Sequence, residues 1–217
     1  MKEERKDLTP PYGHLARLLR PFPDFDPSFI KPVRQKAVEL LDLKEGDRVL
    51  DVGCGPGGSF PYLVRAVGQS GQVVGVEISP EISINARTRI EKNRWRNVEV
   101  IEAAAQEVHL TGTFDGLLMF AAADVYASEE ALENIFPHLN EKARVAAFGA
   151  KLSSSRLGRI LNPLLRLLFN LSFSATPRPD YEPWRILAKR VENLDVEEYF
   201  LGLMFLTSGS VVTKRRH

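Results

Sequence analysis

The chain has 217 residues, a formal net charge of +1 and 44% hydrophobic residues, which fits one soluble α/β domain. The nearly balanced charge argues against a general nucleic-acid-binding surface, and the single cysteine, Cys54, excludes a disulfide within the chain. The charged opening residues lack the apolar core of a signal peptide, and no apolar run approaches the ~20 residues of a membrane span, so a cytoplasmic protein is predicted.

The first 43 residues are predicted to form an arm followed by an amphipathic helix. Four prolines surround a short apolar run in the arm, which ends near residue 25. Asp26 and Pro27 then fit the N-cap and the first position of a helix, and apolar residues follow at helical spacing.

Strand and helix patterns alternate over the next hundred residues. The apolar segments predicted as strands are 48–53, 72–79, 97–103, 114–121 and 143–152, and the segments predicted as helices are 57–68, 79–92 and 128–139. Such alternation predicts right-handed crossovers and a parallel sheet that is covered by helices on both faces.

The last third of the chain departs from this alternation. A Leu-rich helical stretch at 155–173 contains Pro163, and a polar loop, a helix at 183–194 and two strand-like runs at 195–202 and 203–212 follow. The two runs are predicted to pair antiparallel and close the sheet. We interpret 1–217 as a single domain with an arm and helix (1–43), a cofactor-binding core (44–151), a lid-like segment (152–193) and a strand pair with a basic tail (194–217).

The stretch LDVGCGPGGS, residues 50–59, fits two kinds of cofactor loop. Gly53, Gly55 and Gly58 spell G-x-G-x-x-G, the pattern of a dinucleotide loop. Gly53, Gly55 and Gly57 spell the tighter G-x-G-x-G. Glu77, at the end of the second predicted strand, suits ribose hydroxyls in either interpretation.

Asp51 favours one of the two ligands. A dinucleotide places two phosphates at the start of the following helix, where a carboxylate at a buried strand end would repel them. S-adenosylmethionine (SAM) has no phosphate and carries an ammonium and a sulfonium, which the same carboxylate attracts. The charge of Asp51 therefore predicts SAM as the cofactor.

The segments VLDVGCGPGG, NVEVIEAAAQEV and FDGLLMF, with the strand that ends in Glu77, resemble the successive motifs of class I SAM-dependent methyltransferases. The resemblance covers roughly residues 44–151. It implies a Rossmann-like three-layer α/β sandwich with a seven-stranded, mostly parallel sheet whose last strand is antiparallel. More generally, the chain resembles the ubiquinone/menaquinone-type and phospholipid-type methyltransferases.

The resemblance also implies roles for residues of the core. Asp51 would lie near the methionine amino group, Gly53, Gly55 and Gly57 would line the methionine and ribose, and Glu77 would bind the ribose hydroxyls.

Further along the core, Ile78 would pack on the adenine and Phe120 would close the methionine side. Many members carry an acid that bonds the adenine amino group where this chain has Ala104. Adenine recognition would therefore rest on backbone groups, on Gln106 or on water.

The candidates for the acceptor side follow the fourth predicted strand. Asp124 could take a proton or hold a cationic amine, and it could equally be a helix cap; Tyr126 is favoured to pack rather than react. Tyr12 and His14 in the arm resemble the region that covers the cofactor in family members acting on small molecules. Tyr181 and Trp184 are further candidates for an acceptor pocket.

The Leu-rich stretch allows two interpretations. Arg156, Arg159 and Arg166 recur near helical spacing among leucines, so 156–169 could rest on an anionic membrane or admit a lipid-like acceptor. A substrate lid or a helix packed against the sheet is the favoured interpretation, because amphipathic helices are the rule in soluble proteins. The four histidines show no metal-ligand spacing, so no metal is predicted.

We therefore predict a SAM-dependent methyltransferase that acts on a small-molecule acceptor, with apolar or lipid-like molecules among the candidates. Three alternatives stay open at this point: an NAD(P)-dependent oxidoreductase, a non-catalytic interaction module with the SAM-binding fold, and a SAM-dependent aminocarboxypropyl transferase. Nucleic acid is not expected as a partner, and the oligomeric state is not predicted.

Overall fold

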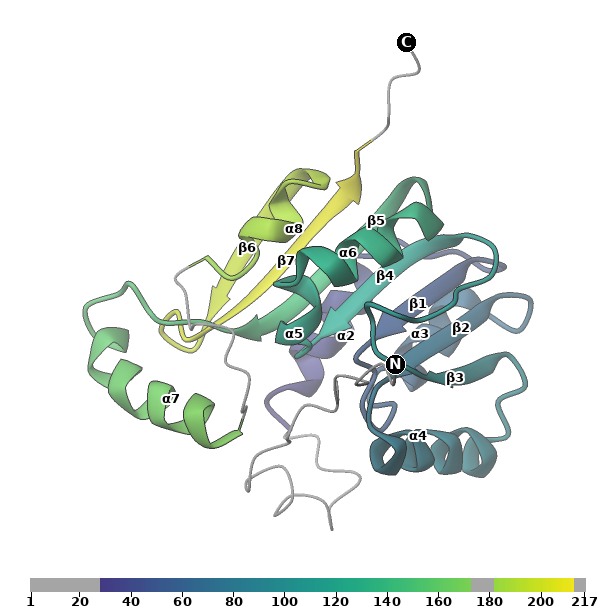
Figure 1. Ribbon diagram of the computed structural model, residues 1–217, viewed down its shortest axis with the longest axis horizontal. Helices are drawn as coiled ribbons and strands as arrows, with labels where there is room; N and C mark the ends of the chain where they lie inside the picture. Colours follow the sequence, from purple (N-terminus) through teal and green to yellow (C-terminus); the bar gives the residue numbers. More distant parts are fainter. Residues whose placement is uncertain (1–27, 173–181, 213–217) are drawn as a thin grey trace, which may run out of the picture.

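The computed structural model describes residues 28–172 and 182–212 (Figure 1). The predicted arm with Tyr12 and His14, the predicted cap at Asp26 and Pro27, Tyr181 and the basic tail lie outside the described residues.

A single sheet of seven strands organises the described chain, in the order β3-β2-β1-β4-β5-β7-β6 (Figure 1). The first five strands pair in parallel, whereas β7 pairs antiparallel with both β5 and β6. The strands are β1 (Arg48–Val52), β2 (Gln72–Glu77), β3 (Val98–Glu102), β4 (Phe114–Phe120), β5 (Leu139–Ala150), β6 (Val191–Tyr199) and β7 (Met204–Val211). This arrangement confirms the predicted fold class.

The helices connect and cover these strands. They are α2 (Lys31–Glu39), α3 (Phe60–Val67), α4 (Pro80–Asn93), α5 (Ala123–Tyr126), α6 (Glu129–Ile135), α7 (Gly158–Ser172) and α8 (Arg185–Ala188), with a 3₁₀ turn at Phe136–His138. As the Ser-Pro pair predicts, Ser79 caps α4, and its hydroxyl accepts a hydrogen bond from the Ile82 N–H at 3.4 Å.

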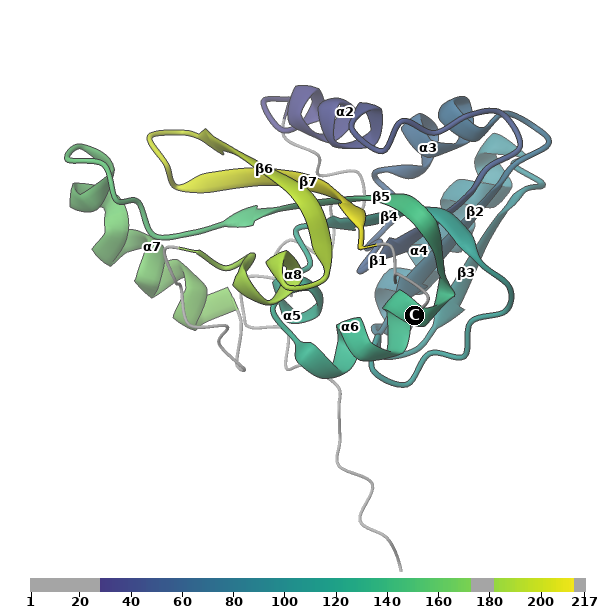
Figure 2. The same ribbon diagram turned by 90° about the horizontal axis from the view of Figure 1, so that it is seen from above.

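Strand side chains alternate between two buried clusters, one on each face of the sheet. Leu50 and Val52 pack with residues of α5, α6 and α8, whereas Val49 packs with residues of α2, α3 and α4. Figure 2 shows α2 and α3 on one side of the sheet and α5, α6 and α8 on the other. Burial on both faces explains why these strands are continuous apolar runs.

From β1 the chain adds β2 and β3 on one side of the sheet, and it then returns to place β4 and β5 on the other side. The strand order therefore reverses between β1 and β4. In open α/β sheets this switch point, at the carboxyl ends of the strands, is where ligands bind. The glycine loop follows β1 there, and α5 follows β4, so the topology brings both to the same edge.

The structure differs from the prediction at two elements. The prediction of a helix at 183–194 is wrong in its second half: α8 ends at Ala188, and β6 begins at Val191. Val191 is buried beside Leu187, and pairing with β7 satisfies the backbone of this segment, so tertiary contacts override the helical pattern. The short helix α5 was not predicted, since four residues are too few for a periodic signal.

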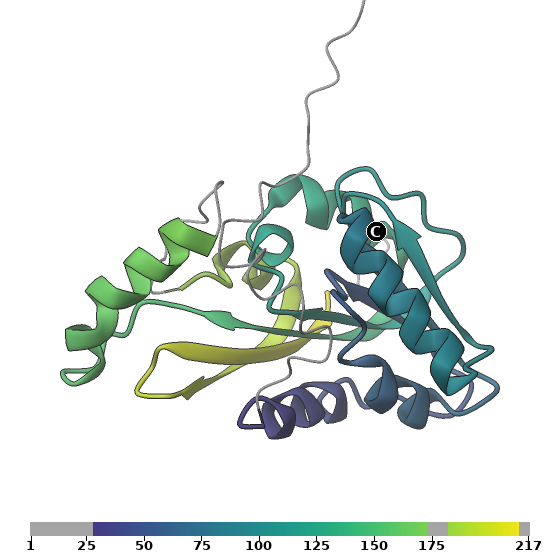
Figure 3. The ribbon, with the colours of Figure 1, turned by 90° about the horizontal axis from the view of Figure 1, so that it is seen from below.

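Helix α7 extends away from the sheet in all three views (Figures 1–3). Its base is fixed by Asn162, whose amide oxygen accepts from the Ser153 N–H at 2.9 Å and whose amide nitrogen donates to the Ser153 carbonyl at 3.0 Å. Among the described residues, no helix has the length and apolar character required to cross a bilayer.

Candidate functional site

Asp51 is a buried carboxylate at the carboxyl end of β1. Its side chain is 0% exposed, and neither carboxylate oxygen has a hydrogen-bond partner among the described residues. Burial raises the pKa of Asp51 to about 7; the nearby Arg34 opposes this shift and Glu77 adds to it. Burying an ionised carboxyl costs folding free energy unless a cation or a hydrogen-bond donor pairs with it.

Arg34 reaches this edge from α2. Its guanidinium lies 4.0 Å above the centroid of the Phe120 ring and donates a 2.9 Å hydrogen bond to the Ser59 hydroxyl. A Cβ at Gly58 would come within 3.1 Å of the Arg34 Cζ. Gly58, the third glycine of the dinucleotide pattern, therefore makes room for a side chain of this protein.

Glu77 holds the glycine loop in place from the end of β2. One carboxylate oxygen accepts from the Gly55 N–H at 3.0 Å, and the other accepts from the Ser79 N–H at 2.8 Å. These two bonds fix the orientation of the carboxylate at the carboxyl end of β2.

The glycines of the loop serve different purposes. Gly53, Gly55 and Gly57 all have positive φ, at 72°, 57° and 77°. A Cβ at Gly53 would collide with Ala122 at 2.6 Å, and one at Gly57 would collide with Phe60 at 2.5 Å. A Cβ at Gly55 would meet nothing within 4 Å, so the backbone there borders open space.

These features fit a cationic, phosphate-free cofactor such as SAM. Two buried carboxylates border the glycine loop: Asp51 precedes it at the end of β1, and Glu77 accepts from its Gly55 N–H. A pyrophosphate would meet like charge there, whereas an ammonium would complete the unpartnered oxygens of Asp51.

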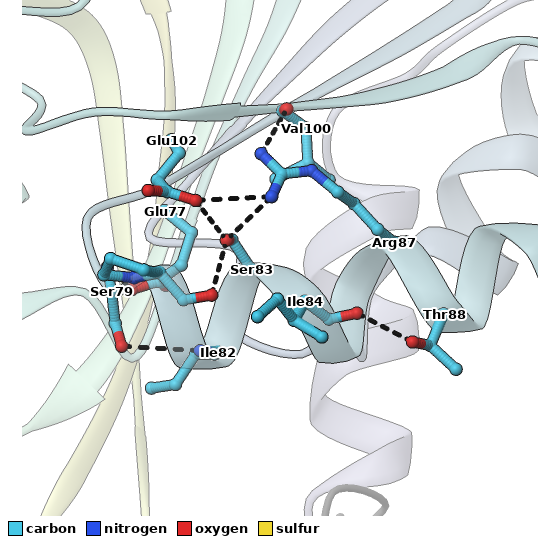
Figure 4. Close-up of polar contacts among 10 residues, drawn as sticks. Glu77, Ser79, Ile82, Ser83, Ile84, Arg87, Thr88, Val100 and Glu102 are labelled. Carbon is cyan, nitrogen blue, oxygen red and sulfur yellow. Dashed lines mark hydrogen bonds and ion pairs between the residues drawn. The ribbon is translucent and has the colours of Figure 1, made fainter.

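Glu102 ends β3 directly beside Glu77, which is its partner in the strand register. Its carboxylate accepts from the Ser83 hydroxyl at 2.8 Å and from the Arg87 guanidinium at 3.3 Å (Figure 4). These two bonds lower the pKa of Glu102, in that order of importance. Glu102 was not predicted as a site residue, and Ala104 occupies the position where an acid was expected.

The other predicted cofactor residues lie around the same edge. Ile78 and Gln106 are half-buried and Ala104 is buried. Phe120 is buried and stacks on Phe148, with ring centroids 4.4 Å apart.

The two candidate catalytic residues share helix α5 but differ in environment. Asp124 is exposed, while the protein around it desolvates its carboxyl and raises its pKa. Tyr126 is 1% exposed and packs edge-on against Phe205 at 5.6 Å, and burial raises the pKa of its hydroxyl strongly. Only the ionised form of a tyrosine can accept a proton from an acceptor molecule, and a raised pKa makes that form rare.

Lys151 is a residue of this edge that sequence reasoning missed. It follows β5, its side chain is 2% exposed, and its Nζ lies 2.6 Å from the Glu198 carboxylate. The same Nζ lies 5.9 Å from the ring centroid of Trp184, which in turn packs on Phe205 at 4.9 Å. The predicted pocket residue Trp184 therefore lies on the same side as Tyr126.

Gly149 of β5 makes room for Tyr126. An added Cβ would collide with the Tyr126 hydroxyl and come within 3.1 Å of the Phe205 ring. We expect Gly149→Ala to lower the free energy of unfolding by about 1–3 kcal/mol, measured by urea denaturation. Tyr126→Phe should restore part of that loss in the double variant, and equal loss with or without Tyr126→Phe would contradict this packing.

Comparisons with known proteins give independent information on the core. Residues 31–129 match the family model of protein-L-isoaspartate(D-aspartate) O-methyltransferase. A protein-L-isoaspartate O-methyltransferase 2 of Archaeoglobus fulgidus is 46% identical over 63 residues, which are 29% of this chain and 29% of that protein. A 23S rRNA (uracil(1939)-C(5))-methyltransferase of Acinetobacter baumannii is 49% identical over 59 residues, 27% of this chain and 13% of that protein.

A solved structure extends the likeness beyond the core. The crystal structure of a SAM-dependent methyltransferase from Aquifex aeolicus superimposes with a TM-score of 0.60 over 87% of this chain and all of that chain, at 23% identity. The chain has the class I SAM-dependent methyltransferase fold.

The comparisons confirm this fold as predicted, and SAM as cofactor agrees with them. The more specific resemblance to ubiquinone/menaquinone and phospholipid methyltransferases receives no support, because the matching proteins are named for isoaspartate and rRNA methylation. The sequence matches cover less than a third of the length of these curated relatives. The family model ends at residue 129, before β5, so Lys151 and Trp184 lie outside the matched segment, whereas Asp124 and Tyr126 lie within it.

Two further observations concern the chemistry of the site. Among the described residues, no three His, Cys, Asp or Glu side chains gather as a metal site. Cys54 is buried beneath the glycine loop, and burial raises the pKa of its thiol, so it packs rather than reacts.

Proposed function

We propose that the protein is a SAM-dependent methyltransferase. The observation that carries the proposal is the fully buried carboxylate of Asp51, whose two oxygens have no hydrogen-bond partner among the described residues. In this proposal Asp51 binds the ammonium of the methionine part, and Glu77 accepts from the ribose hydroxyls while it holds Gly55. Ile78, Ala104 and Gln106 border the adenine.

SAM supplies an electrophilic methyl group whose bonding electrons leave with sulfur. The residues of the chain then need to align an acceptor, exclude water and remove a proton where the acceptor carries one. Phe120 forms an apolar wall on the methionine side, and Arg34 holds its ring from above. Asp124 is the proton acceptor in this proposal, because its raised pKa and exposed carboxyl suit that role.

The acceptor that we favour is a small apolar or lipid-like molecule. One aromatic side chain supports it: Trp184 is half-buried and packs on Phe205, on the side of the sheet that holds Asp124. The ion pair between the buried Lys151 and the exposed Glu198 side chain would place charged groups beside Trp184.

A protein acceptor is the second candidate, and the family match at residues 31–129 favours it. Relatives from Archaeoglobus fulgidus and Methanococcus aeolicus are named protein-L-isoaspartate O-methyltransferases. Incubation with methyl-labelled SAM and either an isoaspartyl peptide or a panel of apolar phenols and amines separates the two candidates. Labelled peptide would favour the protein acceptor, and the mass added to any product distinguishes methyl from aminocarboxypropyl transfer.

Calorimetry with SAM and with its demethylated product tests the cofactor site. We expect Glu77→Ala to weaken binding of both about 10- to 100-fold, because it removes a charged hydrogen-bond acceptor and the clamp on Gly55. The matched control is Glu99→Ala, which removes an exposed carboxylate of β3 that accepts from the Gln72 amide. The affinity of the control variant for SAM and for its demethylated product should stay within about threefold of the wild-type value.

Two outcomes would count against this cofactor site. Wild-type protein that binds neither SAM nor its demethylated product would refute the proposed function. Binding of NAD(H) in its place would favour the oxidoreductase alternative.

A further inference from the structure

We propose that one end of this protein binds an anionic lipid surface through α7 and the neighbouring β6–β7 turn. This proposal concerns association of the protein with a lipid surface, and it does not depend on methyl transfer. Its basis is an exposed apolar surface that is continuous across three elements, together with an excess of basic residues around it.

Large apolar side chains gather at this end. The exposed ones among the described residues are Phe29, Leu157, Ile160, Leu161, Leu164, Leu167, Phe200 and Leu201, with Ile84 and Val212 elsewhere. We call the first eight the apolar rim. Ile160 is 74% exposed and Leu157 is 66% exposed, values that are costly in water for side chains of this size.

Direct contacts connect members of the apolar rim. The rings of Phe29 and Phe200 meet edge to face with centroids 5.3 Å apart. The carbonyl of Leu201, the next residue, accepts hydrogen bonds from the hydroxyls of Ser153 and Ser155, just before α7 begins. Figures 1 and 3 show α7 and the β6–β7 turn at the same end of the molecule.

Helical geometry gives α7 one apolar side. Ile160, Leu164 and Leu167 follow at intervals of four and three residues and therefore share a face. Arg159 and Arg166, seven residues apart, lie on the opposite side and are exposed. A helix with a leucine-rich face and arginines on its polar face is suited to the interface of a bilayer rather than to its interior.

Charge around the rim selects an anionic partner. The segment 151–172 contains Lys151, Arg156, Arg159 and Arg166 and no acidic residue. The two nearest acids of β6, Glu197 and Glu198, are each paired with a lysine, at 2.6 Å from Lys36 and from Lys151 respectively. The end therefore presents net positive charge beside aliphatic side chains, which complements anionic lipid headgroups above an acyl layer.

Sedimentation of the full chain with lipid vesicles, without SAM, tests the proposal. We expect binding to vesicles of phosphatidylcholine and phosphatidylserine, weaker binding at high salt, and at least about tenfold weaker binding to phosphatidylcholine alone. The double variant Ile160→Ser with Leu164→Ser should reduce binding about tenfold or more. The double variant Arg159→Gln with Arg166→Gln should remove most of the salt dependence.

The matched control is Ile84→Ser on α4, which changes an equally exposed side chain, at 58%, away from the rim. It should bind as wild type does, and unchanged melting temperatures show that all variants fold. Wild-type protein that stays in solution with anionic vesicles would overturn the proposal. So would a lipid-independent dimer that Ile160→Ser dissociates, since the rim would then serve a second copy of the chain.

Discussion

The Asp51→Asn substitution should weaken binding of SAM by about 100-fold or more, because it removes the negative charge with which the ammonium of SAM would pair. The side chain keeps its size and remains fully enclosed, so packing changes little. Calorimetric titration of wild type and Asp51→Asn with the demethylated product measures the effect without turnover. Equal affinities would show that Asp51 does not contact the cofactor.

The affinity of the wild-type protein should also depend on pH. Burial raises the pKa of Asp51 to about 7, so its carboxyl is increasingly protonated below that pH and loses its attraction for an ammonium. We expect wild-type affinity to fall as the pH drops below about 7. The same titration series with Asp51→Asn should be flat over that range, which assigns the dependence to this carboxyl.

The cofactor-free protein should become less stable as the pH rises from about 4 to about 7. In that window the unfolded chain has already ionised Asp51, whereas the folded chain still holds its proton. The folded state therefore binds more protons, and the free energy of unfolding falls with increasing pH. A shift of the pKa from 3.8 to about 7 corresponds to about 4 kcal/mol.

Urea denaturation across this pH range measures the loss, and Asp51→Asn is the matched control. The variant has no carboxyl to ionise, so it should be about 2–4 kcal/mol more stable than wild type at pH 8 and nearly equal at pH 4. One substitution would thus stabilise the protein while removing cofactor binding. A variant that is less stable than wild type at pH 8 would contradict the assigned cause.

The core was predictable because its signals are local. Apolar runs, Ser79-Pro80 and the glycines at 53, 55 and 57 each specify a conformation within a few residues, and the structure confirms them. The unpartnered state of Asp51 was not predictable, since it depends on how strands pack around the side chain.

The residues that were missed reach the site from distant parts of the chain. Arg34 comes from α2, and Lys151 pairs with Glu198 across 47 positions of sequence. No local pattern marks such contacts. The prediction that the helix at 183–194 continues to residue 194 was wrong for a related reason. Pairing of β6 with β7 decides the conformation there.

The irregular register of β6 has a consequence for how molecules of this protein meet. β6 forms one border of the sheet, and its pairing with β7 shifts between Glu192 and Asp195. A straight, apolar border would offer its backbone groups to a strand of another molecule. The shift distorts that border, and the exposed carboxylates of Glu192 and Asp195 lie along it, so we expect the border to resist pairing with a strand of a second copy.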